Sequence, residues 1–289
     1  MYHEPLFRPP AEAYSAILQA IIGCSWNRCA FYEMYTSKKF SSRSMAELKP
    51  EIELLAKIYP RTRKVFLADG NAFVLPAKKL VPILKEINQQ FGNLQRISSY
   101  ALPKDILSKT SDELAEIRNL GLKLLYIGIE TGDEELLQKI KKGETFNSTV
   151  DGILKAHAAG IETSVMIING LGGEKYSVQH AINSAKIINL VHPKFLSTLT
   201  LSLPYGPNHF RHRFLGEYIP LSTRGHFAEL HRFISGLEVN NVIFRSNHVS
   251  NALDLEGTLN KDKNLLLEKL EHAIQNTPEG VYPSLPPVL

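Results

Sequence analysis

The sequence predicts an α/β fold, in which apolar strands alternate with helices along most of the chain. Runs that read as strands recur, and segments with apolar residues at the helical period separate them. The predicted strands cover residues 16–22, 64–68, 94–101, 124–132, 163–168 and 195–203. Gly23, Asp69 and Asn169 directly follow three of them and Gly132 ends a fourth, and strand ends are where the loops of such folds build binding sites.

The composition is that of an ordinary globular chain. Of the 289 residues, 44% are hydrophobic and 21% are charged, and the net charge is +4. No apolar run approaches the ~20 residues needed to cross a bilayer. We see no signal peptide, and two cysteines fit a reducing cytoplasm. The basic residues are scattered, so we expect neither a nucleic-acid nor a membrane partner.

The first predicted strand breaks at Gly23 into a loop that holds both cysteines of the chain, Cys24 and Cys29. Two interpretations from the residues alone are a pair of inert buried cysteines beside a core tyrosine, Tyr32, and a short disulfide. The pattern Cys-x4-Cys-x2-Tyr after a first strand also resembles the cluster loop of the radical S-adenosylmethionine (SAM) superfamily. We follow this resemblance because later segments repeat it.

In that family three cysteines hold a four-iron cluster, and the fourth iron is left for SAM. The resemblance implies that Cys24 and Cys29 are metal ligands if a cluster is present, and that Phe31 lies against adenine. The third ligand position is Tyr32. Cluster iron prefers soft thiolates, whereas a phenol is a hard donor with a pKa of ~10 when free. Two thiolates and one tyrosine should hold a cluster poorly.

The second strand runs into Asp69, Gly70 and Asn71, where the family carries the motif that binds the amino group of SAM. A carboxylate suits an ammonium group, and glycine lets the backbone approach a ligand. Taken alone, Asp-Gly-Asn is a common turn. Ser99 at the end of the third strand is a candidate for the SAM carboxylate. We expect Lys38 on the solvated surface, or in a basic loop beside a carboxylate of SAM or of a substrate.

The fourth and fifth strands end in two further motifs. Glu130 lies in a Gly-x-Glu-Thr-Gly segment that resembles a strand end whose acid binds the ribose hydroxyls of SAM. The acids from Asp133 onward are expected to cap the next helix. Asn169, Gly170 and Leu171 resemble the family's fifth-strand motif, which packs against adenine. The glycine-rich turn would instead cradle a phosphate in an unrelated barrel.

The resemblance weakens after Leu203 and returns at residues 243–263. Polar residues there follow an apolar strand, and we assign Arg245 and His248 to catalysis and Asn247 and Asn251 to substrate binding. Tyr35 is a further substrate-binding candidate. His209 and His212 have the spacing of metal ligands on a helix, but surface or substrate-facing histidines fit better without a third ligand.

The motifs follow one another in the family's order. They imply a partial (β/α)6 barrel, similar to a TIM barrel, of the radical SAM type. The predicted organisation is an extended arm at residues 1–13, the partial barrel at residues 14–205 and a C-terminal extension at residues 206–289 that completes the site.

The implied cofactor is SAM, with a [4Fe-4S] cluster only if the chain holds one. Our first hypothesis is an enzyme that uses the sulfonium of SAM as a polar electrophile, with Tyr32 near the vacated cluster position. The alternatives are a radical enzyme with an atypically ligated cluster and a non-catalytic SAM-binding protein. The expected partner is a small-molecule substrate, or SAM alone.

Overall fold

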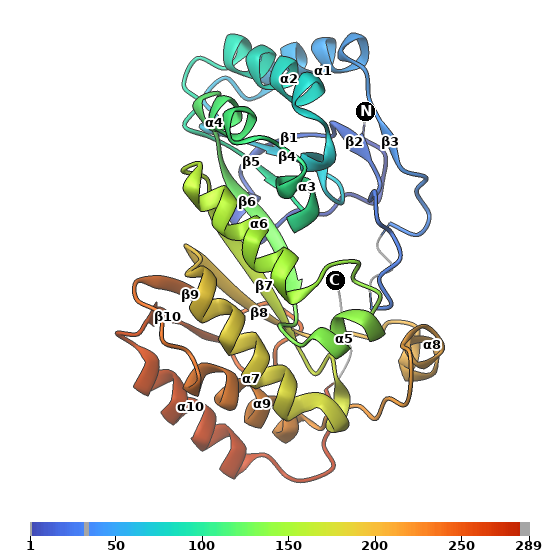
Figure 1. Cartoon of the computed structure of the whole chain (residues 1–289), viewed down its shortest axis with the longest axis vertical. Coiled ribbons are helices and arrows are strands. Elements are labelled where there is room, and N and C mark those ends of the chain that lie inside the picture. Colours follow the sequence, from blue (N-terminus) through green and yellow to red (C-terminus); the bar gives the residue numbers. More distant parts are fainter. Residues whose placement is uncertain (1, 32–34, 284–289) are drawn as a thin grey trace. The chain divides into compact units, whose positions relative to one another are not determined.

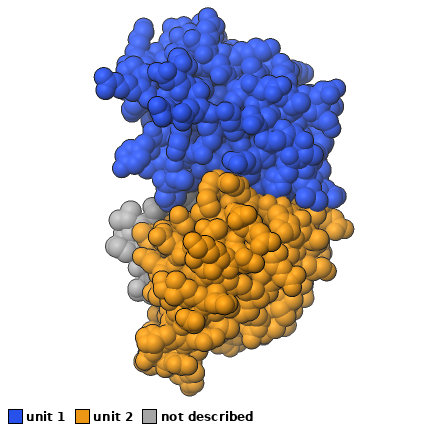
Figure 2. Space-filling view, turned by 90° about the vertical axis from the view of Figure 1, so that its left-hand side faces the viewer, with its two compact units in different colours: residues 1–27, 32–127, 151–163 blue, residues 28–31, 128–150, 164–289 orange. Residues whose placement is uncertain are grey.

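The computed structural model of the protein describes residues 2–31 and 35–283. The chain forms two compact units, each assembled from three stretches of sequence (Figure 2). The first unit comprises residues 1–27, 32–127 and 151–163, and the second comprises residues 28–31, 128–150 and 164–289. The predicted segments 14–205 and 206–289 do not coincide with these units, and that organisation stays a prediction.

The first unit is built on parallel strands. They pair in the order β1 (Ala16–Leu18), β4 (Lys64–Leu67), β5 (Arg96–Tyr100) and β6 (Leu122–Glu130), whose last three residues belong to the second unit. The predicted single strand at residues 16–22 is wrong. The chain breaks after β1, because the backbone oxygens of Gln19 and Ala20 accept hydrogen bonds from Arg43. Residues 21 and 22 instead form β2 (Ile21–Ile22), which pairs with β3 (Ser41–Ser42).

The helices of the first unit begin where the sequence provides caps. Ser44 and Glu47 form a capping box at the start of α1, and Thr110 and Glu113 form one at the start of α4. Helices α1 and α2 lie side by side (Figure 1). The helical elements are η1 (Pro10–Glu12), α1 (Met45–Ile58), η2 (Ala72–Val74), α2 (Ala77–Gln90), α3 (Pro103–Leu107), α4 (Ser111–Asn119) and α6 (Phe146–Ala158), which starts in the second unit.

The second unit continues the parallel pattern. Strand β7 (Glu162–Asn169), whose first two residues belong to the first unit, pairs with β8 (Phe195–Thr200), which pairs with β9 (Val242–Ser246). Strand β10 (Leu255–Leu259) runs antiparallel to β9 and was not predicted. Helices α7, α9 and α10 lie side by side (Figure 1). The helices are α5 (Glu134–Lys139), α7 (Gly173–Val191), α8 (Gly206–Arg213), α9 (Thr223–Ser235) and α10 (Lys263–Asn276).

The predicted fold class, an α/β fold with parallel strands, is confirmed. Asp133 caps α5 as expected, because its Oδ1 accepts a hydrogen bond from the backbone N–H of Leu136 at 2.9 Å. The predicted strand at residues 195–203 ends earlier, at Thr200. In the described part of the chain no helix is both long and apolar enough to span a membrane.

Candidate functional site

Asp69 lies directly after β4 and is fully buried, with a left-handed backbone at φ = 68°. Its Oδ2 accepts a hydrogen bond from the backbone N–H of Gly23 at 2.8 Å, and the Lys38 Nζ lies 3.1 Å from both carboxylate oxygens. The expectation of a solvated Lys38 is wrong, since this side chain is only 5% exposed. The alternative, a basic loop beside a carboxylate of SAM or of a substrate, stays untested, because the carboxylate that Lys38 contacts is the protein's own Asp69. The ammonium group of Lys38 therefore contacts the carboxylate that we expected to bind the ammonium of SAM.

Gly70 lies against the cysteine loop. Its N–H donates to the backbone oxygen of Gly23 at 3.1 Å. A Cβ added at Gly70 would lie 2.3 Å from the Cβ of Cys24, which is closer than real Cβ atoms approach. Glycine is thus required here by close packing, and the contact holds the loop after β1 on the turn after β4. Cys24 is a free, half-buried thiol.

Asn71 ties the same loop to a carboxylate that the sequence analysis missed. Its Oδ1 accepts from the backbone N–H of Ser25 at 3.0 Å, and its Nδ2 donates to Ser25 Oγ at 2.8 Å and to Asp105 Oδ2 at 2.7 Å. Burial raises the pKa of Asp105, and the Asn71 hydrogen bond opposes that shift. Because Asp105 follows no strand end, no motif indicated it.

Two other candidates of the first unit are buried. Ser99 donates its hydroxyl to the backbone oxygen of Tyr100 at 2.9 Å. Tyr35 is 1% exposed, and its ring packs edge-on against Phe7 with the ring centroids 5.6 Å apart. Their assignments to ligand and substrate binding stay predictions.

The second unit holds Cys29 and Phe31. The guanidinium of Arg213 donates to the backbone oxygen of Cys29 at 2.7 Å. Phe31 packs on a buried aromatic and aliphatic cluster, and Lys142 Nζ lies 5.9 Å from its ring centroid. The cluster contains Ala30, Leu136, Ile140, Leu171, Tyr176, Phe210, Phe214 and Tyr218.

Glu130 ends β6 and is 8% exposed, again with a left-handed backbone, at φ = 65°. Its Oε1 accepts a hydrogen bond from Lys142 Nζ at 2.8 Å. A Cβ added at Gly128 would lie 2.0 Å from this Oε1, so the carboxylate folds back over Gly128. A side chain at position 128 would therefore force this carboxylate to shift. Sequence reasoning counted Lys142 among scattered basic residues and missed the pair.

The turn after β7 contains Asn169, Gly170 and Leu171, all of which are buried. Leu171 belongs to the cluster that Phe31 contacts, so the structure brings these two adenine candidates of the second unit together. Asn169 lines a small hollow at the ends of β7, β8 and β9.

The hollow has a volume of ≈ 20 Å³, room for about one water molecule. Asn251 lines it and donates from Nδ2 to the backbone oxygen of Thr198 at 2.9 Å. Its wall combines polar and apolar side chains. The polar ones come from Asn169, Thr200, Thr223, His226, Ser246, Ser250 and Asn251, and the apolar ones from Phe227, Leu230, Ala252, Leu253 and Pro283.

The remaining C-terminal candidates lie apart from this hollow. His248 contacts Ser250 Oγ through Nδ1 at 2.8 Å, and burial lowers the pKa of His248. Arg245 and Asn247 are exposed, and Arg245 Nε lies 3.6 Å from Glu256 on β10. The structure thus brings Asn251 to the hollow and leaves Arg245 and Asn247 on the surface of the unit.

The cysteines bear on whether a cluster fits. The chain has two cysteines, one in each unit. Tyr32 lies outside the described residues. Within the described ranges no three His, Cys, Asp or Glu side chains gather as a metal site, and His209 and His212 are exposed on α8. A three-cysteine ligand set for a cluster does not fit this sequence.

The family model described as "Radical SAM superfamily" matches residues 23–185. The heme chaperone HemW of Bacillus subtilis (strain 168) is 22% identical over 168 residues, which make up 57% of this chain and 44% of that protein. All of the described motifs from the cysteine loop to the turn after β7 fall within the matched residues.

Solved structures share the fold. The radical SAM methyltransferase TsrM from Kitasatospora setae, with cobalamin and a [4Fe-4S] cluster bound, has a TM-score of 0.55 at 21% identity and covers 67% of this chain and 38% of its own. Methylornithine synthase (PylB) has a TM-score of 0.53 at 18% identity, and the match covers 93% of this chain and 82% of that protein's chain. The chain spans less than half the length of HemW and TsrM. At these identities the structural likeness shows the fold alone.

Proposed function

Because the chain belongs to the radical SAM superfamily and yet has only two cysteines, we propose that it is an enzyme that uses SAM in polar rather than radical chemistry. The reaction would be alkyl transfer or an intramolecular displacement within SAM. The partner would be a small-molecule substrate, or SAM alone, in the cytoplasm.

One observation carries this proposal, namely the tyrosine at position 32 of the cysteine loop. A phenol is almost wholly protonated at neutral pH and is a poor replacement for a soft thiolate on cluster iron. The loop otherwise keeps Cys24, Cys29 and Phe31 of the family pattern. A fold that retains its nucleoside motifs and lacks a cluster ligand favours chemistry that needs SAM without iron.

The residues proposed to bind SAM differ in how available their polar atoms are. Glu130 has one oxygen on Lys142, and its Oε2 has no hydrogen-bond partner among the described residues, so it offers an acceptor to a ribose diol. Asp69 would have to release Lys38 to bind the amino group of SAM. The other residues proposed to hold SAM are Phe31, Gly70, Asn71, Ser99, Asn169, Gly170 and Leu171.

When bound, SAM supplies an electrophilic carbon beside a positively charged sulfur. The chain's own part would be to bind and orient the ligand and to move a proton. Tyr32 would lie with its ring against the cation or act as a base through its hydroxyl. His248 has a lowered pKa and is therefore neutral at pH 7, which suits a proton acceptor. The TsrM comparison supports the transferase class, because that protein with the same fold is a methyltransferase.

The test is incubation of the purified protein with SAM, followed by mass analysis of every SAM-derived product. We expect a colourless protein, purified in air, that forms S-adenosylhomocysteine or methylthioadenosine. The variant Tyr32→Phe should retain SAM binding and lose turnover if the hydroxyl is the base. A brown protein with stoichiometric iron and sulfide that forms 5′-deoxyadenosine under reductant would overturn the proposal.

Two further outcomes distinguish the alternatives. Saturable SAM binding with no product after prolonged incubation would identify a non-catalytic SAM-binding protein. Iron uptake by Tyr32→Cys but not by the wild type would show that the tyrosine is what prevents cluster binding. Iron uptake by both would favour an atypically ligated cluster.

A further inference from the structure

The turn after β7 is held by residues of the C-terminal segment, which lies outside the residues matched by the family model. Gly170 has φ = 79°, a conformation that favours glycine. Its N–H donates to Glu229 Oε1 on α9 at 2.6 Å, and its carbonyl oxygen accepts from the Tyr218 hydroxyl at 3.0 Å. Both backbone polar groups of Gly170 are therefore bound by the same segment.

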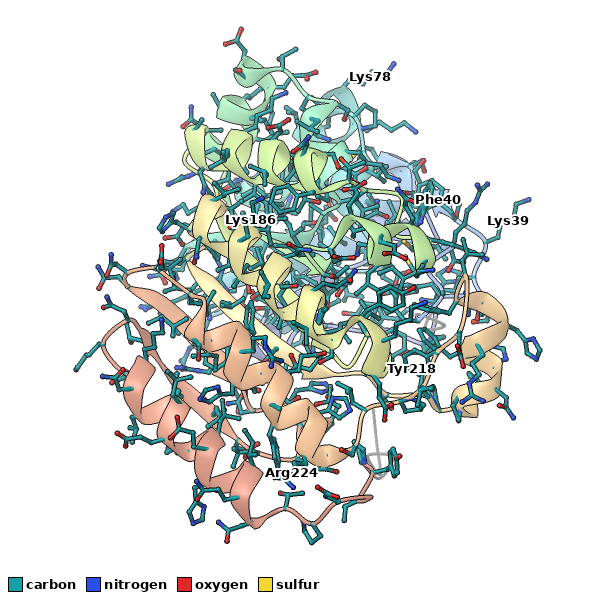
Figure 3. The ribbon with its side chains drawn as sticks, turned by 60° about the horizontal axis from the view of Figure 1, so that its bottom comes forward. Lys39, Phe40, Lys78, Lys186, Tyr218 and Arg224 are labelled. Atoms are coloured by element: carbon teal, nitrogen blue, oxygen red, sulfur yellow. The ribbon has the colours of Figure 1, made fainter. Side chains whose placement is uncertain are left out.

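A third residue of this segment, His226 on α9, fills the space above Gly170. A Cβ added there would lie 2.1 Å from Cε1 of His226, so the imidazole ring takes the place that a side chain would need. Tyr218 lies beside the first turn of α7 (Figure 3), where its Cδ2 would be 3.1 Å from a Cβ at Gly173. The turn is thus held by two hydrogen bonds between Gly170 and this segment, and by the close packing of His226 and Tyr218.

Burying the carboxylate of Glu229 at this turn costs free energy. It is 1% exposed, and burial raises its pKa, while His180, whose Nε2 is 3.8 Å from Oε1, and the Gly170 N–H oppose that shift. A buried carboxylate costs free energy unless it is hydrogen-bonded. Apolar residues of the same size would pack α9 without that cost, so packing alone does not explain an acid here.

We infer that Glu229 is a positioning residue for the nucleoside half of the ligand. The inference rests on the proposed function, since Gly170 and Leu171 form the turn proposed to pack against adenine. By holding the Gly170 N–H, Glu229 fixes the peptide orientation that presents Leu171 to the cluster shared with Phe31. Recognition of the adenosyl group then depends on a side chain that does not touch it.

The experiment compares Glu229→Ala, Glu229→Gln and the wild type by calorimetric titration with S-adenosylhomocysteine and with methylthioadenosine. Glu229→Ala removes the acceptor, and we expect both ligands to bind about tenfold more weakly. Glu229→Gln keeps an oxygen acceptor for the Gly170 N–H and should restore affinity to within about twofold of the wild type. A purely structural role predicts no such rescue tied to ligand affinity.

The matched control is Glu271→Ala, because Glu271 also contacts α9, through His231 at 3.2 Å, but is exposed. It should leave both affinities unchanged. Hydrogen exchange at the Gly170 amide gives a second readout without ligand, and Glu229→Ala should accelerate it. If Glu229→Ala does not fold, Tyr218→Phe, which removes only the hydroxyl bound to Gly170, should weaken both ligands about threefold.

The outcomes separate the inference from the function on which it rests. Unchanged affinities in Glu229→Ala, with a wild type that binds, overturn the inference and leave the proposed function standing. Faster exchange at Gly170 with unchanged affinities also overturns the inference alone. A wild type that binds neither ligand overturns both.

Discussion

The ends of β4 and β6 both carry a buried acid, but the two acids are paired differently. Each ends in a buried acid with a left-handed backbone, Asp69 and Glu130, and each acid is paired with a lysine from a loop. Asp69 engages both oxygens and is fully buried. Glu130 engages one oxygen with Lys142 and is 8% exposed. The comparison teaches that the two acids differ in how fully they are engaged: both carboxylate oxygens of Asp69 are bound within the protein, whereas Lys142 contacts one oxygen of Glu130.

The largest expected effect breaks the pair at β4. Asp69→Asn keeps the side-chain shape and tolerates the left-handed backbone, but it leaves the Lys38 charge buried without a partner, which costs about 3–5 kcal/mol. Urea denaturation would measure the loss in the free energy of unfolding. The control Asp151→Asn, on the exposed face of α6, should change stability by less than about 0.5 kcal/mol. A loss below about 1 kcal/mol in Asp69→Asn would show that the pair is solvated.

The next prediction concerns the pH dependence of stability due to His226, which packs against Gly170 in the turn after β7. Burial lowers the pKa of His226 to about 4 from its ordinary 6.5, so the unfolded chain binds a proton there at a higher pH than the folded chain. Stability is therefore present above pH 6.5 and is lost as the pH falls towards 4, by about 3 kcal/mol in total.

Urea denaturation across this pH window checks the sign. His226→Phe should flatten the dependence, whereas His231→Gln, at a partly exposed position on the same helix, should not. An equally steep loss in His226→Phe would assign the pH dependence to other groups.

A smaller effect is expected where Glu130 folds back. In Gly128→Ala the new methyl group would collide with Glu130 Oε1, and such overpacking costs about 1–3 kcal/mol. Thermal unfolding would report the loss. Gly92→Ala is the matched control, because no atom lies within 4 Å of a Cβ there. Equal melting temperatures for the two variants would mean that the carboxylate has room to move.

The smallest expected effect concerns ligand binding by Glu130. Glu130→Gln replaces an acceptor oxygen by a donor, and we expect S-adenosylhomocysteine to bind about tenfold more weakly. Calorimetric titration measures this, with Glu135→Gln as an exposed control on α5. Unchanged affinity in Glu130→Gln would show that the carboxylate of Glu130 does not contact the ligand.

Whether the sequence could predict a contact depends on how far apart along the chain the two contacting residues lie. Strand ends and caps follow from local patterns, so the positions of Asp69 and Glu130 at strand ends and the cap at Asp133 were predicted. The partners Lys38, Lys142 and Glu229 lie 31, 12 and 59 residues from their contacts, and no period in the sequence marks such pairs. Strand β10 was missed because a β-hairpin was not expected after the polar run at Asn251.

The division of the chain into two units has a practical consequence. Each unit is assembled from three discontinuous stretches, and β6, α6 and β7 each contain residues of both. No single pair of start and stop codons can therefore encode one unit without the other. Isolating a complete unit would therefore require joining its stretches with designed linkers or a circularly permuted gene.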